Sequence, residues 1–229
     1  MPLLERAPLL ASLTASMDEA LRGRGRLVLL GGEAGVGKSS LLHTFARGLP
    51  PTVDVLVGLC DPVSTPKPLG PLLDVAAALG IEVADAAYTT ARHDVFRGVL
   101  AALGRRPGGT LLVFEDVHWA DGATLDLLRY LGRRIDGIRA LLVASYRDEE
   151  VGARHPLRIV VGDLATSASV SRLAVPPLSP EAVRTLAEGH SVDTAALHRR
   201  TGGNPFFVSE ILASDDGGAL PGARCGARA

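Results

Sequence analysis

The sequence predicts a three-layer α/β fold, in which a mainly parallel sheet of five strands lies between two layers of helices. Three observations predict this fold. Five short apolar runs alternate with longer segments of helical character, a pattern typical of a parallel sheet covered on both faces. A glycine-rich loop joins the first run to a helical segment, and a proline pair at 176–177 ends the alternation. We expect a small helical subdomain beyond that point.

The strands are expected where short, continuous apolar runs occur, because a strand buried on both faces shows no polar alternation. We interpret five runs as buried strands: Leu27–Leu30, Val53–Leu59, Leu111–Phe114, Leu141–Ala144 and Ser171–Val175. Helical segments lie between successive runs, as in the crossover connections that parallel strands require.

The helices are expected in the longer periodic segments of the chain. Those before the proline pair are Ala7–Arg22, Lys38–Leu49, Leu69–Leu79, Thr90–Leu103, Ala123–Ile135 and His155–Leu164. In the fifth of these, Leu125, Leu128 and Leu131 share one face. Asp121 precedes that helix and is expected to be its N-cap, since aspartate side chains accept hydrogen bonds from the first backbone amides.

The proline pair marks a domain boundary, because proline ends regular structure. Beyond it, Ser179 is expected to cap a helix that has Pro180 at its first position. Two further helices are expected over Asp193–Arg200 and Pro205–Ala213. We therefore predict an α/β domain over residues 1–175 and a partial helical lid over residues 176–213. Residues 214–229 are rich in Gly, Ala and Arg without apolar periodicity, and we expect them to form a disordered tail.

The composition excludes several classes of protein. The formal net charge is −1, so no overall positive field draws the chain to nucleic acid or anionic lipid. No apolar run approaches the roughly 20 residues of a membrane span, and no signal-peptide core follows the N-terminus. Cys60 and Cys225 have neither disulfide-framework nor metal-site spacing. We expect a cytoplasmic protein that does not associate with membranes.

A phosphate-binding loop is the most specific motif of the sequence. The segment Gly32–Ser39 reads GEAGVGKS and matches the pattern G-x-x-x-x-G-K-[ST], between a strand and a helix as the motif requires. Its glycines let backbone amides turn toward phosphates, and the helix N-terminus favours the same anion. Lys38 would reach the β- and γ-phosphates and the Ser39 hydroxyl would bind Mg²⁺. The residues expected to contact the nucleotide are Gly32, Glu33, Ala34, Gly35, Val36, Gly37, Lys38, Ser39 and Ser40.

Adenine is the expected base. Guanine-specific proteins with this loop usually carry an [NT]KxD element, and the only other lysine of the chain, Lys67, stands between two prolines. The fold is therefore expected to be that of a P-loop NTPase that binds ATP or ADP with Mg²⁺. The alternative is a glycine-rich turn with an incidental lysine.

Two adjacent carboxylates follow the third apolar run. Glu115 and Asp116 come directly after Leu111–Phe114, and the C-terminal ends of parallel strands face the ligand crevice. We expect Glu115 to hold Mg²⁺ through water and Asp116 to orient the water that attacks the γ-phosphate. The alternative is an acidic, solvated start of a loop.

Four segments together resemble a known family: Gly32–Ser39, Phe114–Asp121, Tyr146–Asp148 and Gly203–Phe207. The chain resembles, from about Leu4 to Ala213, the ATPase module of the LuxR-type and MalT-like bacterial regulators. These regulators belong to the signal-transduction ATPases with numerous domains, an AAA-related group. Members of the family continue into a winged helix, a helical-repeat region and a DNA-binding helix-turn-helix, so we expect either a stand-alone minimal module or a truncated gene product.

The resemblance implies roles for single residues. Arg147 matches the sensor that reads the γ-phosphate, and the alternative is a solvated arginine among acidic neighbours. Pro205 matches a lid proline that packs on adenine, and it also suits the first position of a helix. Arg6 matches part of an adenine-side box whose glycine is missing here. His118 and Trp119 match the family without an implied catalytic role, and we expect a capping histidine and a core-filling tryptophan. Glu115 departs from the pattern, because the family usually has Asp at that position.

The function expected from these features is that of a Mg-ATP-binding regulatory switch with slow hydrolysis, in which Lys38, Asp116 and Arg147 are the catalytic candidates. The alternatives are a stand-alone ATPase, a P-loop kinase, or a truncated remnant that only binds nucleotide. The expected partners are the nucleotide and a protein or second copy bound through the lid. No DNA binding is expected from this chain alone.

Overall fold

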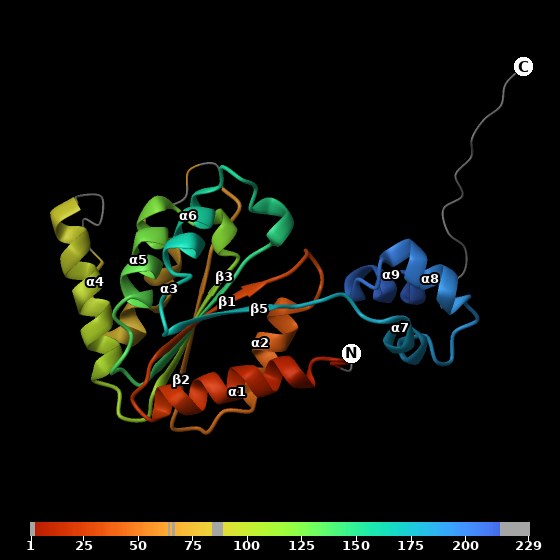
Figure 1. Cartoon of the computed structure of the whole chain (residues 1–229), viewed down its shortest axis with the longest axis horizontal. Helices are drawn as coiled ribbons and strands as arrows, with labels where there is room; N and C mark the ends of the chain where they lie inside the picture. Colours follow the sequence, from red (N-terminus) through yellow and green to blue (C-terminus); the bar gives the residue numbers. More distant parts are fainter. Residues whose placement is uncertain (1–2, 64, 66, 84–88, 216–229) are drawn as a thin grey trace, which may run out of the picture.

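The computed structural model describes residues 3–63, 65, 67–83 and 89–215. A five-stranded sheet forms the centre of the described part of the molecule (Figure 1). Its order is β2-β3-β4-β1-β5, and all four neighbouring pairs are parallel. The strands are β1 (Arg26–Gly31), β2 (Asp54–Leu59), β3 (Thr110–Glu115), β4 (Ala140–Ser145) and β5 (Val170–Ala174). The predicted α/β fold with a parallel sheet is confirmed.

Helices cover the two faces of the sheet unequally. One face packs on α1 (Ala7–Leu21) and α2 (Lys38–Arg47). The other face packs on α3 (Gly70–Leu79), α4 (Thr89–Gly104), α5 (Gly122–Gly132) and α6 (Pro156–Asp163). Successive residues of a strand point to opposite faces, so alternate residues of β1 enter two separate cores and both sets are fully buried.

The prediction of buried strands is wrong for the two edges of the sheet. β2 is an edge strand, and Val55 and Val57 are 41% and 43% exposed. β5 lies at the opposite edge, where Ser171 and Arg172 are exposed. An edge strand has one neighbour, and helices cover it less completely than they cover a central strand. The three central strands β3, β4 and β1 are buried as predicted.

Helix capping follows the residues expected from the sequence. The Asp121 side chain accepts hydrogen bonds from the backbone amides of Ala123 and Thr124 and so caps α5. The Ser179 side chain caps the first lid helix. Two short 3₁₀ helices were not predicted: η1 (Val117–Trp119) follows β3, and η2 (Asp148–Glu150) follows β4. Both begin next to the ends of central strands, where the candidate site lies.

The helical part predicted to be a lid, called the lid below, consists of α7 (Pro180–Leu186), α8 (Thr194–Thr201) and α9 (Pro205–Asp215), set to one side of the sheet beyond β5 (Figure 1). Its helices share a small apolar core of their own, and Leu4 from the N-terminal segment packs against it. α9 continues to Asp215, so it runs past the predicted end at Ala213. The rest of the predicted tail, residues 216–229, lies outside the described residues.

None of the helices in the described part of the chain is both long enough and apolar enough to cross a membrane.

Candidate functional site

The phosphate loop connects β1 to α2. Gly35 and Gly37 have φ values of +74° and +97°, which residues with a side chain rarely adopt. At Gly35 a β-carbon would also lie 2.7 Å from the Cβ of Phe206 in the lid. The loop therefore needs glycine at this position both for its own conformation and for the approach of the lid.

The Lys38 ammonium points into the loop. Lys38 is 8% exposed, and its Nζ donates hydrogen bonds to the carbonyl oxygens of Gly32 (2.6 Å) and Glu33 (2.9 Å). Burial lowers the pKa of Lys38, although the carboxylates of Asp116 and Glu149 act in the opposite direction. The two carbonyl oxygens accept the hydrogen bonds that phosphate oxygens would accept from the same ammonium.

The two residues expected to hold Mg²⁺ lie in contact. The Ser39 hydroxyl, in the first turn of α2, donates a hydrogen bond to Oε2 of Glu115 at the end of β3. One hydroxyl and one carboxylate suit Mg²⁺, which keeps several waters and takes its other ligands from phosphates. No cluster of three or more His, Cys, Asp or Glu side chains among the described residues forms a separate metal site.

Asp116 is held in an uncommon backbone conformation. Its φ is +55°, and its backbone amide donates a hydrogen bond of 3.1 Å to the hydroxyl of Ser145 on the neighbouring strand β4. Asp116 lines the same pocket as the phosphate loop, and its Oδ1 lies 3.9 Å from Nε of Arg147. A left-handed residue at the end of a central strand is typical of functional sites, where strain is tolerated.

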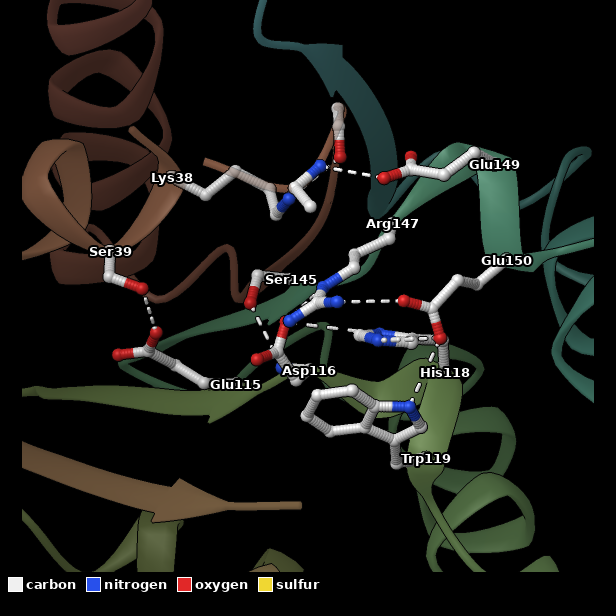
Figure 2. A network of polar contacts seen from close by, with 12 residues as sticks. Lys38, Ser39, Glu115, Asp116, His118, Trp119, Ser145, Arg147, Glu149 and Glu150 are labelled. Atoms are coloured by element: carbon white, nitrogen blue, oxygen red, sulfur yellow. Dashed lines mark hydrogen bonds and ion pairs between the residues drawn. The ribbon is translucent and has the colours of Figure 1, made fainter. Parts of the chain in front are cut away.

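Arg147 lies in a polar network with residues of η1 and η2 (Figure 2). Its Nη1 is 2.7 Å from Oε1 of Glu150, and its guanidinium stacks over the Trp119 ring, 4.6 Å from the ring centroid. The Trp119 indole donates a hydrogen bond of 3.1 Å to the same Glu150 carboxylate. The candidate sensor is therefore oriented by Glu150 and Trp119.

His118 and Trp119 differ from their expected structural roles. His118 caps no helix; it is buried within η1, and neither ring nitrogen makes a hydrogen bond. Oδ1 of Asp116 lies 3.8 Å from Nδ1, and Oε2 of Glu150 lies 3.5 Å from Nε2. Burial lowers the pKa of His118 even though both carboxylates favour the imidazolium. Trp119 is only partly buried and contacts Arg147, so it is more than a residue that fills the core.

The backbone of Ala34, in the phosphate loop, is held through both its N–H and its carbonyl group. Its N–H donates to Oε1 of Glu149 at 2.7 Å, and its carbonyl accepts a hydrogen bond of 2.7 Å from Nδ2 of Asn204. The other amide atom of Asn204, Oδ1, accepts from the backbone N–H of Phe206 in the first turn of α9. Asn204 is buried and joins the lid directly to the phosphate loop.

A pocket of about 380 Å³ brings most of the predicted residues together. It is lined by Ala34, Gly35, Gly37, Lys38, Ser39, Ser40, Asp116, Arg147, Pro205, Phe206 and Ser209. Gly32, Glu33 and Val36 belong to the same loop without lining this pocket, and Glu115 reaches its edge through Ser39. The pocket combines backbone amides, one ammonium, one guanidinium and one carboxylate, which suits a phosphorylated ligand.

Arg6 lies away from this pocket, between the phosphate loop and the linker to the lid. It is 2% exposed, and its Nη2 donates hydrogen bonds to the carbonyl oxygens of Val36 (3.3 Å) and Pro176 (2.7 Å). The neighbouring Glu5 accepts hydrogen bonds from the backbone and the hydroxyl of Ser179. In this structure the N-terminal segment therefore joins the loop to the lid, and an adenine contact of Arg6 stays a prediction.

We expect Arg6→Ala to lower the free energy of unfolding by about 2–3 kcal/mol, because the carbonyl groups of Val36 and Pro176 would lose their donor and a cavity would remain. Urea unfolding followed by circular dichroism measures the change. Arg22→Ala, at an exposed arginine after α1, is the matched control. It should leave the urea concentration at the midpoint of unfolding unchanged. An equal loss in both variants would contradict the proposed role of Arg6.

Sequence reasoning missed several residues that shape the site. Glu149 and Glu150 come from η2, Ser145 comes from the end of β4, and Asn204 comes from the lid. Asn204 carried a detectable signal, because an asparagine before a helix-starting proline is a common N-cap. Glu149 and Glu150 lie in a run of acidic residues. That run does not indicate that Glu149 binds Ala34 and that Glu150 binds Arg147.

Comparisons with known proteins agree with this geometry. A family model described as the AAA ATPase domain matches residues 2–144. An uncharacterized protein of Rhizobium meliloti is 29% identical over 258 residues, which cover 92% of this chain and 25% of that protein. This chain thus spans about a quarter of the length of that relative.

Solved structures share the fold at low identity. The Orc1 protein of Aeropyrum pernix, solved in complex with DNA, superposes with a TM-score of 0.62 at 20% identity, covering 94% of this chain and 60% of that one. A signal-transduction ATPase with numerous domains and a tetratricopeptide-repeat sensor, from Pyrococcus horikoshii, superposes with a TM-score of 0.53 at 18% identity. The superposition covers 92% of this chain and 30% of the Pyrococcus horikoshii protein.

Proposed function

This chain belongs to the AAA ATPase domain family, and on that premise we propose that it is a Mg-ATP-binding switch module with slow hydrolysis. The single observation that supports this most is the pocket in which Lys38, Asp116 and Arg147 meet the phosphate loop. We further propose the kinship with the ATPase modules of LuxR-type and MalT-like regulators, which rests on the four sequence segments that resemble them.

The phosphate loop and its lysine would bind the di- or triphosphate. Backbone amides from Gly35 onward and the N-terminus of α2 present partial positive charge to the phosphates. Lys38 would exchange its two loop carbonyls for phosphate oxygens without moving far. Ser39 and Glu115 would hold Mg²⁺, which neutralises phosphate charge when it is bound. Pro205 lines the pocket from the lid side, which is compatible with packing on adenine.

Asp116 and Arg147 are the candidates for the chemical step. Asp116 would accept a hydrogen bond from the attacking water and orient it toward the terminal phosphate. Arg147 would contact the same phosphate and stabilise the charge that develops on it. Both side chains line the pocket, and Oδ1 of Asp116 lies 3.9 Å from Nε of Arg147, so a water held by Asp116 would lie close to a phosphate held by Arg147.

Slow hydrolysis follows from the lengths and partners of these side chains. Glu115 has one methylene more than the aspartate usual in the resembling family, which displaces the carboxylate that holds the metal. Arg147 is engaged by Glu150 and Trp119, and it is the only arginine among the described residues that line the pocket. A misplacement near 1 Å costs about a hundredfold in rate. We therefore expect turnover well below about 10 per second.

Glu115→Asp tests the proposed function directly. We expect the wild type to release phosphate from Mg-ATP slowly and the variant to release it faster, by about tenfold, because the shorter carboxylate restores the family's geometry. Steady-state phosphate release measures both. No release above background from the wild type under saturating Mg-ATP would remove the hydrolytic part of the proposal. A slower Glu115→Asp variant would show that glutamate already has the working geometry here.

The lid supports a role as a switch. Phe206 and Phe207 in the first turn of α9 are 54% and 53% exposed, while Asn204 just before them is bonded to the phosphate loop. A conformational change in the phosphate loop would therefore be passed to Phe206 and Phe207 through the hydrogen bond between Ala34 and Asn204. We propose that a protein partner or a second copy contacts this part of the lid.

We also propose that this chain alone does not bind DNA specifically. The DNA in the Aeropyrum pernix structure is a property of that protein, and a likeness at 20% identity extends only to the fold. The formal net charge of −1 provides no overall attraction to phosphate backbones.

A further inference from the structure

The carboxylate of Glu149 binds the phosphate loop where a ligand anion would bind. Its Oε1 accepts a hydrogen bond of 2.7 Å from the backbone N–H of Ala34. Burial opposes ionisation, but the Ala34 amide and the charges of Lys38 and Arg147 favour it, and the pKa of Glu149 lies below its usual value. In Figure 2 the dashed line from Glu149 ends in the loop beside Lys38. An anion of the protein itself therefore occupies one amide of the loop.

The amide that donates to Glu149 belongs to a residue that lines the pocket, although Glu149 itself does not line it. Lys38 opens α2, so the first phosphates of a nucleotide lie against that helix N-terminus. Ala34 lies further from α2 along the loop and lines the pocket together with Asp116 and Arg147. The charges of Lys38 and Arg147 both act on the Glu149 carboxylate, so the terminal phosphate that Arg147 is proposed to contact would lie near Glu149, and ADP lacks that phosphate.

We propose that Glu149 is a specificity-determining residue that competes with the γ-phosphate for the loop and so lowers the affinity for ATP relative to ADP. This inference rests on the proposed nucleotide-binding function. ADP leaves the Glu149 contact with Ala34 in place. ATP has to displace the carboxylate, because two anions cannot share one N–H donor and repel each other at close range.

Displacement of Glu149 by the γ-phosphate would affect both the lid and Arg147. Ala34 donates through its N–H to Glu149 and accepts through its carbonyl from Asn204 of the lid, in the two peptide groups that flank its Cα. Glu149 also neighbours Glu150 in η2, which holds Arg147. Displacement of Glu149 therefore disturbs one contact of the lid and the turn that orients the sensor, and ADP disturbs neither.

The experiment compares affinities for ADP and for the β,γ-imido analogue of ATP, with Mg²⁺, by isothermal titration calorimetry. The variants are Glu149→Ala, which removes the contact, and Glu149→Gln, which keeps an acceptor for the Ala34 amide but removes the charge. We expect Glu149→Ala to bind the ATP analogue at least about fivefold more tightly than the wild type does. Glu149→Gln should show a smaller gain, and ADP affinity should change less than about twofold in both.

Asp18→Asn is the matched control, since it removes one exposed carboxylate from α1 and should change neither affinity. An unchanged or weaker affinity for the ATP analogue in both Glu149 variants would overturn the inference. An equal gain for ADP would overturn it too, because that result points to a general charge effect. Failure of the wild type to bind either nucleotide would instead remove the proposed function.

Discussion

Replacing Lys38 by alanine is expected to weaken binding of Mg-ATP at least about tenfold. The ammonium is buried in the loop and already donates to two carbonyl oxygens, so it needs little rearrangement to donate to phosphate. Loss of a hydrogen-bond partner to a charged group costs about 1.5–3 kcal/mol, and 1.4 kcal/mol corresponds to tenfold in affinity. Isothermal titration with ATP and ADP measures the effect.

The chain supplies its own matched control for this experiment. Lys67 is the only other lysine, is exposed, and lies outside the pocket that contains Lys38. We expect Lys67→Ala to bind ATP like the wild type. Lys38→Met should bind as weakly as Lys38→Ala, since it keeps the apolar stem without the charge. Wild-type affinity in both Lys38 variants would refute the proposal that this loop binds the phosphates.

The fold could be predicted because its central strands are apolar without interruption. Leu111–Phe114 and Leu141–Ala144 have no polar residue that would face solvent, and both strands are buried on both faces. Apolar runs of this kind indicate a covered parallel sheet. Their order along the chain does not reveal that β4 lies between β1 and β3, since pairing depends on packing across the whole domain.

The edge strands differ from the central ones in composition, but not by enough to have been recognised. Val53–Leu59 contains Asp54 and Ser171–Val175 contains Ser171 and Arg172, whereas the central runs have no polar residue. Val55 and Val57 are apolar and yet exposed in β2. Local composition reports the preference of a segment for burial, whereas its place in the sheet decides how many neighbours cover it. The same limit applies at helix ends, where α9 runs past Ala213.

The candidate site was predictable where its chemistry is local in sequence. Gly32–Ser39 and the pair Glu115 and Asp116 are contiguous motifs, and the structure brings residues of both to one pocket, while their roles stay predictions. The contacts of Ala34 with Glu149 and with Asn204 join residues 115 and 170 positions apart. Neither contact follows from a pattern, because each depends on how the turn after β4 and the lid approach the loop.

Asp116→Asn is expected to lower the rate of phosphate release about a hundredfold while leaving ATP affinity close to that of the wild type. Asparagine cannot take up the proton of the attacking water, and positioned general bases contribute about 10²- to 10⁴-fold. The substitution suits the backbone, since asparagine tolerates left-handed conformations such as the φ of +55° found here. The backbone amide that donates to Ser145 is retained as well.

Two measurements separate catalysis from folding in this variant. Single-turnover phosphate release reports the chemical step, and calorimetric titration with ATP reports binding. Asp18→Asn, which removes an exposed carboxylate from α1, should match the wild type in both. Loss of binding together with rate in Asp116→Asn would assign the residue a structural role through Ser145. A wild-type rate would show that another group orients the water. A slow chemical step with intact binding would agree with Asp116 in contact with that water, as its place beside Lys38 and Arg147 in the pocket leads us to expect.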